Sequence, residues 1–171
     1  SSWVAEGETL LLGSLTANNT VNFTNNIVLS GGRFDDRVVN VTANAGDTAA
    51  GLDAFSVNDV AVLSGVISSA DAFHQLSKDG SGVLELTGDN TYTGATSIAN
   101  GVLIVSSDAN LGVAPSAAYA LNTSSTFQTS GAITPGAIVI DTGATLATDT
   151  SFALNSNRTI LLGSGTSGLA A

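Results

Sequence analysis

The sequence contains no cysteine, no methionine and only one histidine, His74. The lack of cysteine excludes disulfides and thiolate metal sites, and a single histidine excludes a two-histidine metal site within this chain. We therefore expect neither a metal ion nor another cofactor. A chain without methionine also lacks a start residue, so we expect a processed or excised piece of a longer protein.

Basic residues are scarce as well. The chain has four of them, Lys78, Arg33, Arg37 and Arg158, against 14 acidic residues, which gives a formal net charge of −10. This charge repels phosphate, so we expect no binding to nucleic acid or to an anionic membrane surface. No apolar run approaches the roughly 18 residues that a membrane helix needs. We expect any export signal or membrane anchor of the parent protein to have been removed.

The residues that are abundant favour strands and turns. Apolar residues make up 43% of the chain, mostly Ala, Val, Leu and Ile, and only 5% of residues are aromatic. Val, Ile and Thr suit pleated strands, Gly and Asn suit turns, and the formers of long helices are few. Strand-sized apolar bursts occur at 10–16, 26–32, 37–46, 60–68, 83–88, 95–107, 137–148 and 158–165.

These bursts recur with a loose period near twenty residues. Val60 and Val83 are 23 residues apart, and Val83 and Val102 are 19 apart. Such a period indicates a solenoid, in which one turn buries its apolar face only by stacking on the next. A β-sandwich also has short strands and regular turns. Small core residues and recurrent Thr, Ser and Asn, which suit ladders between stacked coils, favour the solenoid.

One segment, residues 76–112, carries a long ordered motif. The motif consists of Lys78, Gly80, Gly82, Leu84, Leu86, Gly88, Asn90, Thr91, Tyr92, Gly94, Thr96, Ile98, Gly101, Leu103, Leu111 and Gly112. In this order and spacing, the segment closely resembles the autotransporter-associated β-strand repeat, or passenger-associated transport repeat, of bacterial secreted passenger domains.

The resemblance implies an all-β fold, a right-handed single-stranded parallel β-helix. Residues 1–171 would form one segment of a larger passenger domain, with the repeat unit at 76–112. The implied function is non-enzymatic and structural or adhesive: the segment is displayed at the bacterial cell surface, and coil stacking supports secretion and rigidity. The implied partners are the rest of the passenger and a C-terminal outer-membrane β-barrel.

The same resemblance sets expectations for loops and corners. Segment 69–77 is longer than the family pattern, and residues 68–79 have some helical spacing. We therefore expect an inserted loop or one short helix at 69–79, with His74 exposed. Loops 69–79 and 113–118 are where a host surface or a glycan would be recognised. The motif glycines are expected at corners, and Tyr92 is expected to cover a corner or, alternatively, to stack on a sugar. Exposed coil edges predict self-association.

Two short stretches match patterns with known chemistry. The triplet Asp141–Gly143 matches that of aspartic proteases, but those sites need two carboxylates that share a proton, and the chain has no second copy. We expect a turn there. The cluster at 33–37 is either a cation or acidic-sugar site, as in lyase-type β-helices, or a solvated loop with local ion pairs. The alternative function is therefore a carbohydrate-binding or lyase-like module, with Asp35 as the residue to test.

One further pattern recurs along the chain. Glycosylation sequons begin at Asn18, Asn22, Asn40, Asn122 and Asn157, and in a chain rich in Asn and Thr they arise by chance.

Alternation within strands predicts which side chains face inward. Leu84 and Leu86 should point inward and Glu85 outward, because an unpaired carboxylate is costly to bury. The family pattern places Leu103 and Val105 on the same inner face and leaves Ile104 outside.

Overall fold

The computed structural model describes residues 2–6, 10–12, 20–30, 36–41, 60–69, 74–118, 135–163 and 168–170. Its elements are β1 (Ser2–Glu6), β2 (Leu10–Leu12), β3 (Thr20–Phe23), β4 (Asn26–Ser30), β5 (Asp36–Val41), β6 (Val60–Leu63), β7 (Ile67–Ser69), β8 (Gln75–Asp79), β9 (Val83–Leu86), β10 (Thr96–Ile98), β11 (Val102–Val105), the 3₁₀ helix η2 (Asp108–Leu111), β12 (Ile138–Ile140), β13 (Thr145–Thr148), β14 (Ile160–Leu162) and β15 (Gly168–Ala170).

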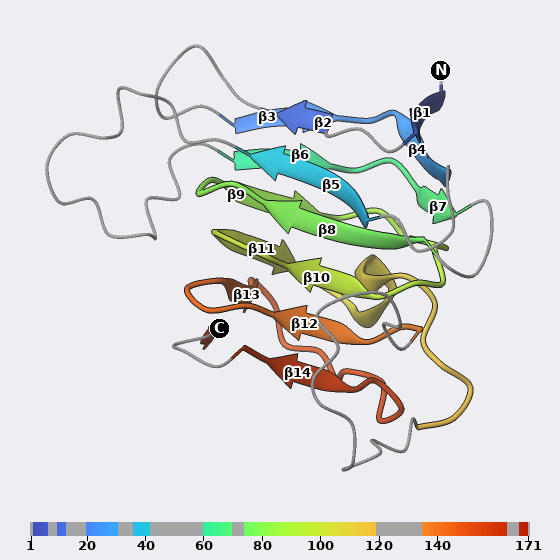
Figure 1. Ribbon diagram of the computed structural model, residues 1–171, viewed down its shortest axis with the longest axis vertical. Helices are drawn as coiled ribbons and strands as arrows, with labels where there is room; N and C mark the ends of the chain where they lie inside the picture. Colours follow the sequence, from blue (N-terminus) through green and yellow to red (C-terminus); the bar gives the residue numbers. More distant parts are fainter. Residues whose placement is uncertain are drawn as a thin grey trace, which may run out of the picture.

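The strands form three sheets in which every pairing between described strands is parallel. One sheet has the order β14-β12-β10-β8-β5-β2, a second has β15-β13-β11-β9-β6-β3, and the third has β1-β4-β7 (Figure 1). Consecutive strands therefore lie in different sheets. We call one passage of the chain through the sheets a round, and each strand pairs with strands of the neighbouring rounds. The predictions of an all-β chain and of parallel pairing are confirmed.

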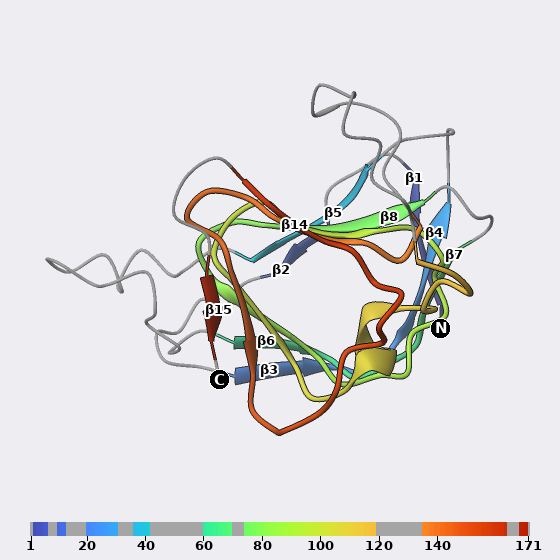
Figure 2. The ribbon, with the colours of Figure 1, turned by 90° about the horizontal axis from the view of Figure 1, so that it is seen from below.

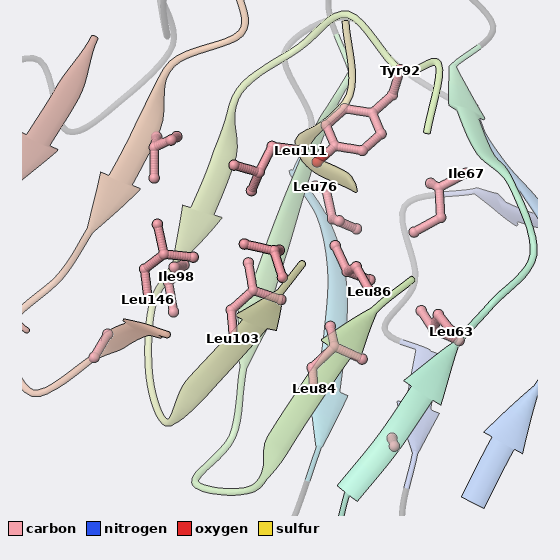
Figure 3. Close-up of a cluster of buried hydrophobic side chains, with 14 of the residues drawn as sticks. Leu63, Ile67, Leu76, Leu84, Leu86, Tyr92, Ile98, Leu103, Leu111 and Leu146 are labelled. Carbon is pink, nitrogen blue, oxygen red and sulfur yellow. The ribbon is translucent and has the colours of Figure 1, made fainter. Parts of the chain in front are cut away.

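The sheets surround a common interior, as Figure 2 shows in the view from below. Sheet pairing places equivalent residues of successive rounds directly above one another, and their inward side chains stack into one core. This core includes Leu63, Ile67, Leu76, Leu84, Leu86, Ile98, Leu103, Leu111, Ile138, Ile140 and Leu146 (Figure 3).

The register of β9 and β11 confirms the predicted inward and outward faces. Leu103 lies opposite Leu84, and Ile104 lies opposite Glu85. Both leucines are fully buried, whereas Ile104 and Glu85 are half-buried on the outer face. Val83 lies on the same face of β9 as Glu85 but is buried, because Val60 and Val102 of the neighbouring strands flank it in register.

The predicted inserted loop at 69–79 is a strand over much of its length. Ser69 ends β7, residues 75–79 form β8, and residues 70–73 lie outside the described part. The helical spacing of this segment misled the prediction. Strand β8 pairs with β5 on one side and β10 on the other, and these two ladders override a weak local preference.

His74, predicted to be exposed, is buried with 1% of its surface accessible. It directly precedes β8, where the backbone of Gly94 from the next round packs closely against the His74 carbonyl group. The residue therefore lies between two stacked rounds rather than on a projecting loop.

The register predicts a large difference between two neighbouring substitutions. Leu103→Asp places a carboxylate in the core and should cost several kcal/mol, enough to unfold a domain of ordinary stability. Ile104→Asp places it on the outer face and should cost about 1 kcal/mol. Thermal melts of both variants test this, and a lower melting temperature for Ile104→Asp would mean that the two faces are exchanged.

Candidate functional site

Two buried asparagines link successive rounds at the corner that follows β9 and β11. Asn90 accepts the backbone N–H of Ile67 on its Oδ1 at 2.7 Å and donates from Nδ2 to the carbonyl oxygen of Asn110 at 2.6 Å. Asn110 donates in turn to the Gly88 carbonyl at 3.0 Å, and its Oδ1 accepts the Ser106 N–H at 2.9 Å. These amides satisfy backbone groups of three rounds that have no strand partner at the corner.

An exposed asparagine makes a related contact between two earlier rounds. Asn26 accepts the backbone N–H of Val66 on its Oδ1 at 2.9 Å. Asparagine suits the positions of Asn90 and Asn110 because a single side chain both donates and accepts. We call Asn26, Asn90 and Asn110 the amide ladder.

Tyr92 lies between β9 and β10 and is completely buried in the core. Its hydroxyl group and the Thr96 hydroxyl are 2.6 Å apart and share a hydrogen bond. Burial raises the pKa of Tyr92, and the Thr96 hydrogen bond and the Arg158 charge lower it by less. The resulting pKa is about 12, so the phenol stays neutral. A sugar cannot stack on this ring, so the alternative prediction of sugar stacking is wrong.

The close approach of Tyr92 explains the glycine at position 112. A Cβ atom on Gly112 would lie 2.8 Å from a ring carbon of Tyr92 and 2.5 Å from its carbonyl oxygen. The φ angle of Gly112 is 74°, a value that other residues rarely adopt. Any other residue here would displace the tyrosine.

Arg158 clamps the 3₁₀ helix η2 to two later rounds. Its Nε lies 2.7 Å from Oδ1 of Asp108, and its Nη2 lies 3.1 Å from Oδ2, a bidentate pair. Nη1 donates to the carbonyls of Leu111 at 3.2 Å and Gly136 at 3.1 Å, and Nη2 donates to that of Gly112 at 2.7 Å. The planar guanidinium can reach all these acceptors at once, which a lysine cannot.

The Asp108 carboxyl group responds to this clamp. Its partial burial alone would raise its pKa, but the Arg158 hydrogen bonds, the Asn155 N–H and the Arg158 charge outweigh burial and lower the pKa below its usual value. The carboxylate form therefore predominates even in mildly acidic solution.

The triplet Asp141–Gly143 lies in the turn between β12 and β13. Asp141 and its two neighbours are exposed, and its N–H donates to the Ile98 carbonyl of the preceding round at 2.9 Å. The triplet therefore forms a corner, as predicted. The described residues contain no cluster of three or more His, Cys, Asp or Glu side chains that could hold a metal ion.

The charge cluster at 33–37 is only partly described. Residues 33–35, including Asp35, lie outside the described residues, while Asp36 and Arg37 begin β5 opposite Gln75 and Leu76.

Two of the sequon asparagines have described side chains. Asn22 is exposed on β3 and accepts the Ser64 hydroxyl at 2.8 Å, whereas Asn157 donates to the Pro115 carbonyl at 3.0 Å. Asn40 lies in β5, where only the backbone is described, and Asn18 and Asn122 lie outside the described residues.

A surface hollow of about 680 Å³ lies beside the loop at 113–118. Its lining consists of Thr93, Val113, Ala114, Pro115, Ser116, Ala117, Ala118 and Pro135. None of these side chains is titratable, so the hollow can bind through apolar contact and two hydroxyl groups but cannot supply an acid or a base.

Comparison with known proteins agrees with the predicted resemblance. Residues 76–105 match the family model described as Passenger-associated-transport-repeat. The chain carries an autotransporter passenger repeat. The chain is also similar to the Adhesin BmaC autotransporter of Brucella suis biovar 1 (strain 1330), with 45% identity over 85 residues. That match covers 47% of this chain and 2% of the relative, so the chain spans a very small part of it. No solved structure matches.

Nearly every distinctive residue of the passenger repeat contributes to packing or to contacts between rounds. Leu84, Leu86 and Leu103 form the core, Asn90 belongs to the amide ladder, and Tyr92 fills the interior. The five motif glycines expected at corners, Gly80, Gly82, Gly88, Gly94 and Gly101, all lie between strands. The described contacts of these motif residues are therefore packing contacts and contacts between rounds.

Sequence reasoning missed the contacts of Asn110 and the Asp108–Arg158 clamp. Arg158 is one of only four basic residues and begins an apolar run. A rare basic residue next to apolar residues was the one sign in the sequence of a buried contact. Its partners are about 50 residues away in sequence, so spacing could not reveal them. Within the described ranges, no helix has the length and hydropathy to cross a membrane.

The clamp predicts an acid-dependent stability difference. Asp108→Asn should lower the free energy of unfolding at pH 7 by about 1–3 kcal/mol, because charge-assisted hydrogen bonds to Arg158 are lost. The folded pKa of Asp108 lies below its unfolded value. The wild-type advantage is therefore fully present above about pH 4 and declines as pH falls through the folded pKa.

Urea unfolding of both proteins from pH 7 to pH 2 measures this difference. Asp89→Asn, at an exposed aspartate outside the clamp, is the matched control and should cost little. A difference between wild type and Asp108→Asn that stays constant over the whole pH range would contradict the clamp.

Proposed function

We propose that this chain is a right-handed, single-stranded parallel β-helix segment of a bacterial autotransporter passenger, displayed at the cell surface as a non-enzymatic structural and adhesive scaffold. The observation that carries the proposal is the use of the repeat motif. Its buried leucines, Tyr92 and Asn90 all hold one round of the chain against the next. The similarity to an adhesin autotransporter supports the same conclusion.

In this proposal the coils supply rigidity and help secretion. Each round that stacks outside the cell buries apolar surface and gains a parallel ladder, so folding opposes backward movement of the chain. The partners are the remainder of the passenger and a C-terminal outer-membrane β-barrel. Contact with host surfaces or glycans is assigned to loops that leave the coils.

A second candidate function, glycan or host-protein binding, is favoured by the hollow beside the loop at 113–118. Val113 is 47% exposed on its rim, and Thr93 and Ser116 add hydroxyl groups to an apolar lining. Glycan arrays with wild type and with Val113→Asp distinguish this function from a passive scaffold. Binding that the substitution abolishes supports recognition at the hollow, whereas no binding to any glycan or host extract supports the scaffold alone.

Surface display tests the main proposal. The chain is fused to an autotransporter barrel in a Gram-negative host, and external protease is added to intact cells. We expect the wild-type segment to reach the surface and to resist protease, and the core variant Leu103→Asp to be displayed poorly or to be digested. Display of the folding-defective variant at the wild-type level would refute a contribution of coil stacking to secretion.

The edge of the stack at β14 predicts self-association. Strand β14 ends its sheet, and its Ile160 and Leu162 are 38% and 54% exposed although they lie opposite the buried Ile138 and Ile140. Open strand edges with apolar side chains pair readily with other chains. Sedimentation of the isolated segment should show association that rises with concentration and weakens in Leu162→Lys. A strict monomer at high concentration would contradict this expectation.

A further inference from the structure

Lys78 is the only lysine in the chain, and it occupies an interior position. It lies on β8 opposite Ile98 of β10, which itself lies opposite Ile140 of β12. The side chain of Lys78 has no accessible surface. A charged group in a column of isoleucines needs a specific set of partners, because burying an uncompensated charge is very costly.

Three backbone carbonyl oxygens surround the Lys78 ammonium group. Nζ donates to the carbonyls of Asp79 at 2.9 Å, Gly80 at 2.6 Å and Asn100 at 2.9 Å. An ammonium group has three donors and no acceptor, so this set satisfies it completely. Asp79 ends β8 and Gly80 begins the corner that follows it, whereas Asn100 belongs to the equivalent corner one round later.

The two corners have the same local construction. Asp79 accepts the Gly80 N–H on Oδ1 at 2.7 Å, and Asn100 accepts the Gly101 N–H on Oδ1 at 2.8 Å. Both glycines have positive φ, 78° and 69°. The turns stack, and their carbonyl oxygens converge on one point. Converging carbonyl dipoles repel one another unless a cation lies between them.

Gly101 keeps the space at this point open. A Cβ atom there would lie 2.5 Å from the Gly80 oxygen, 2.6 Å from the Gly82 oxygen and 2.9 Å from Nζ. The Gly82 oxygen therefore lies beside the same position, although it is not a hydrogen-bond partner of Nζ. We call the carbonyl oxygens of Asp79, Gly80 and Asn100 the carbonyl cage.

We propose that the carbonyl cage is a binding site for a monovalent cation of ammonium type, and that the Lys78 side chain is its resident cation. The charge that joins these two rounds is thus carried by the chain itself and does not have to be taken from the medium. In the next two rounds, Ile98 of β10 and Ile140 of β12 hold the positions equivalent to Lys78. The site therefore belongs to the two rounds that contain β8 and β10.

Burial lowers the pKa of Lys78, and the charge of Asp79 raises it by less, so the pKa is about 8. At pH 7 the side chain is therefore predominantly the ammonium ion that the cage requires.

The first test uses the wild-type protein and the presence of a single lysine. After labelling with ¹⁵N-lysine, NMR should show one Nζ resonance whose protons exchange slowly at pH 6–7. Amine-acetylating reagents should modify the chain's α-amino group in the folded protein but reach Lys78 only after unfolding. Fast proton exchange together with acetylation of Lys78 at the rate seen in urea would overturn the proposal.

The second test empties the cage. Lys78→Ala removes the ammonium and leaves space, whereas Lys78→Met removes the charge but fills the space. Ammonium chloride should raise the melting temperature of Lys78→Ala by about 3 °C or more above tetramethylammonium chloride at equal ionic strength, by mass action on the folded state. Lys78→Met and wild type should show no such difference.

Equal responses of Lys78→Ala and Lys78→Met to the two salts would overturn the cation site. Folding of Lys78→Ala only in ammonium chloride would support it. If this variant folds in neither salt, the proton-exchange and acetylation measurements on wild type decide the question.

Discussion

The structure depends on one constraint: no round of this chain can bury its apolar face alone. The described strands are three to six residues long, and each pairs only with strands of neighbouring rounds. Leu84 and Leu103 are completely buried because their rounds stack in register. A shift of one residue would place Glu85 in the core, so the register is strongly specified. Packing and pairing are therefore gained together or lost together.

The same constraint determines what happens at the corners. Backbone groups there leave the sheet ladders but stay close to the interior, where an unsatisfied N–H or C=O is costly. The amide ladder satisfies one set of corners, Arg158 satisfies the carbonyls around η2, and Lys78 satisfies those of the carbonyl cage. Each of these side chains reaches into a neighbouring round. These polar residues thus strengthen the stack that the buried leucines form.

Sequence alone predicted the features that depend on local alternation and on the ordered motif. The strand class and the inward Leu84 and Leu86 follow from period-two alternation, whereas the passenger repeat and the inward Leu103 are what the family resemblance implies. It failed where tertiary contacts decide the outcome. Residues 75–79 look helical but form a strand between two ladders, and His74 and Tyr92 are buried by adjacent rounds. The partners of Arg158 lie too far away in sequence to be deduced.

The central claim is that side chains of the repeat bind the corners of one round to those of the next. Amide hydrogen exchange of the backbone N–H group of Ile67 tests it most directly, because Ile67 begins the edge strand β7 and its N–H donates to the Asn90 side chain of the next round. The account predicts that it exchanges as slowly as amides paired inside the sheets, and that it loses this protection in Asn90→Ala. Exchange in the wild type at the rate of exposed loop amides would contradict it.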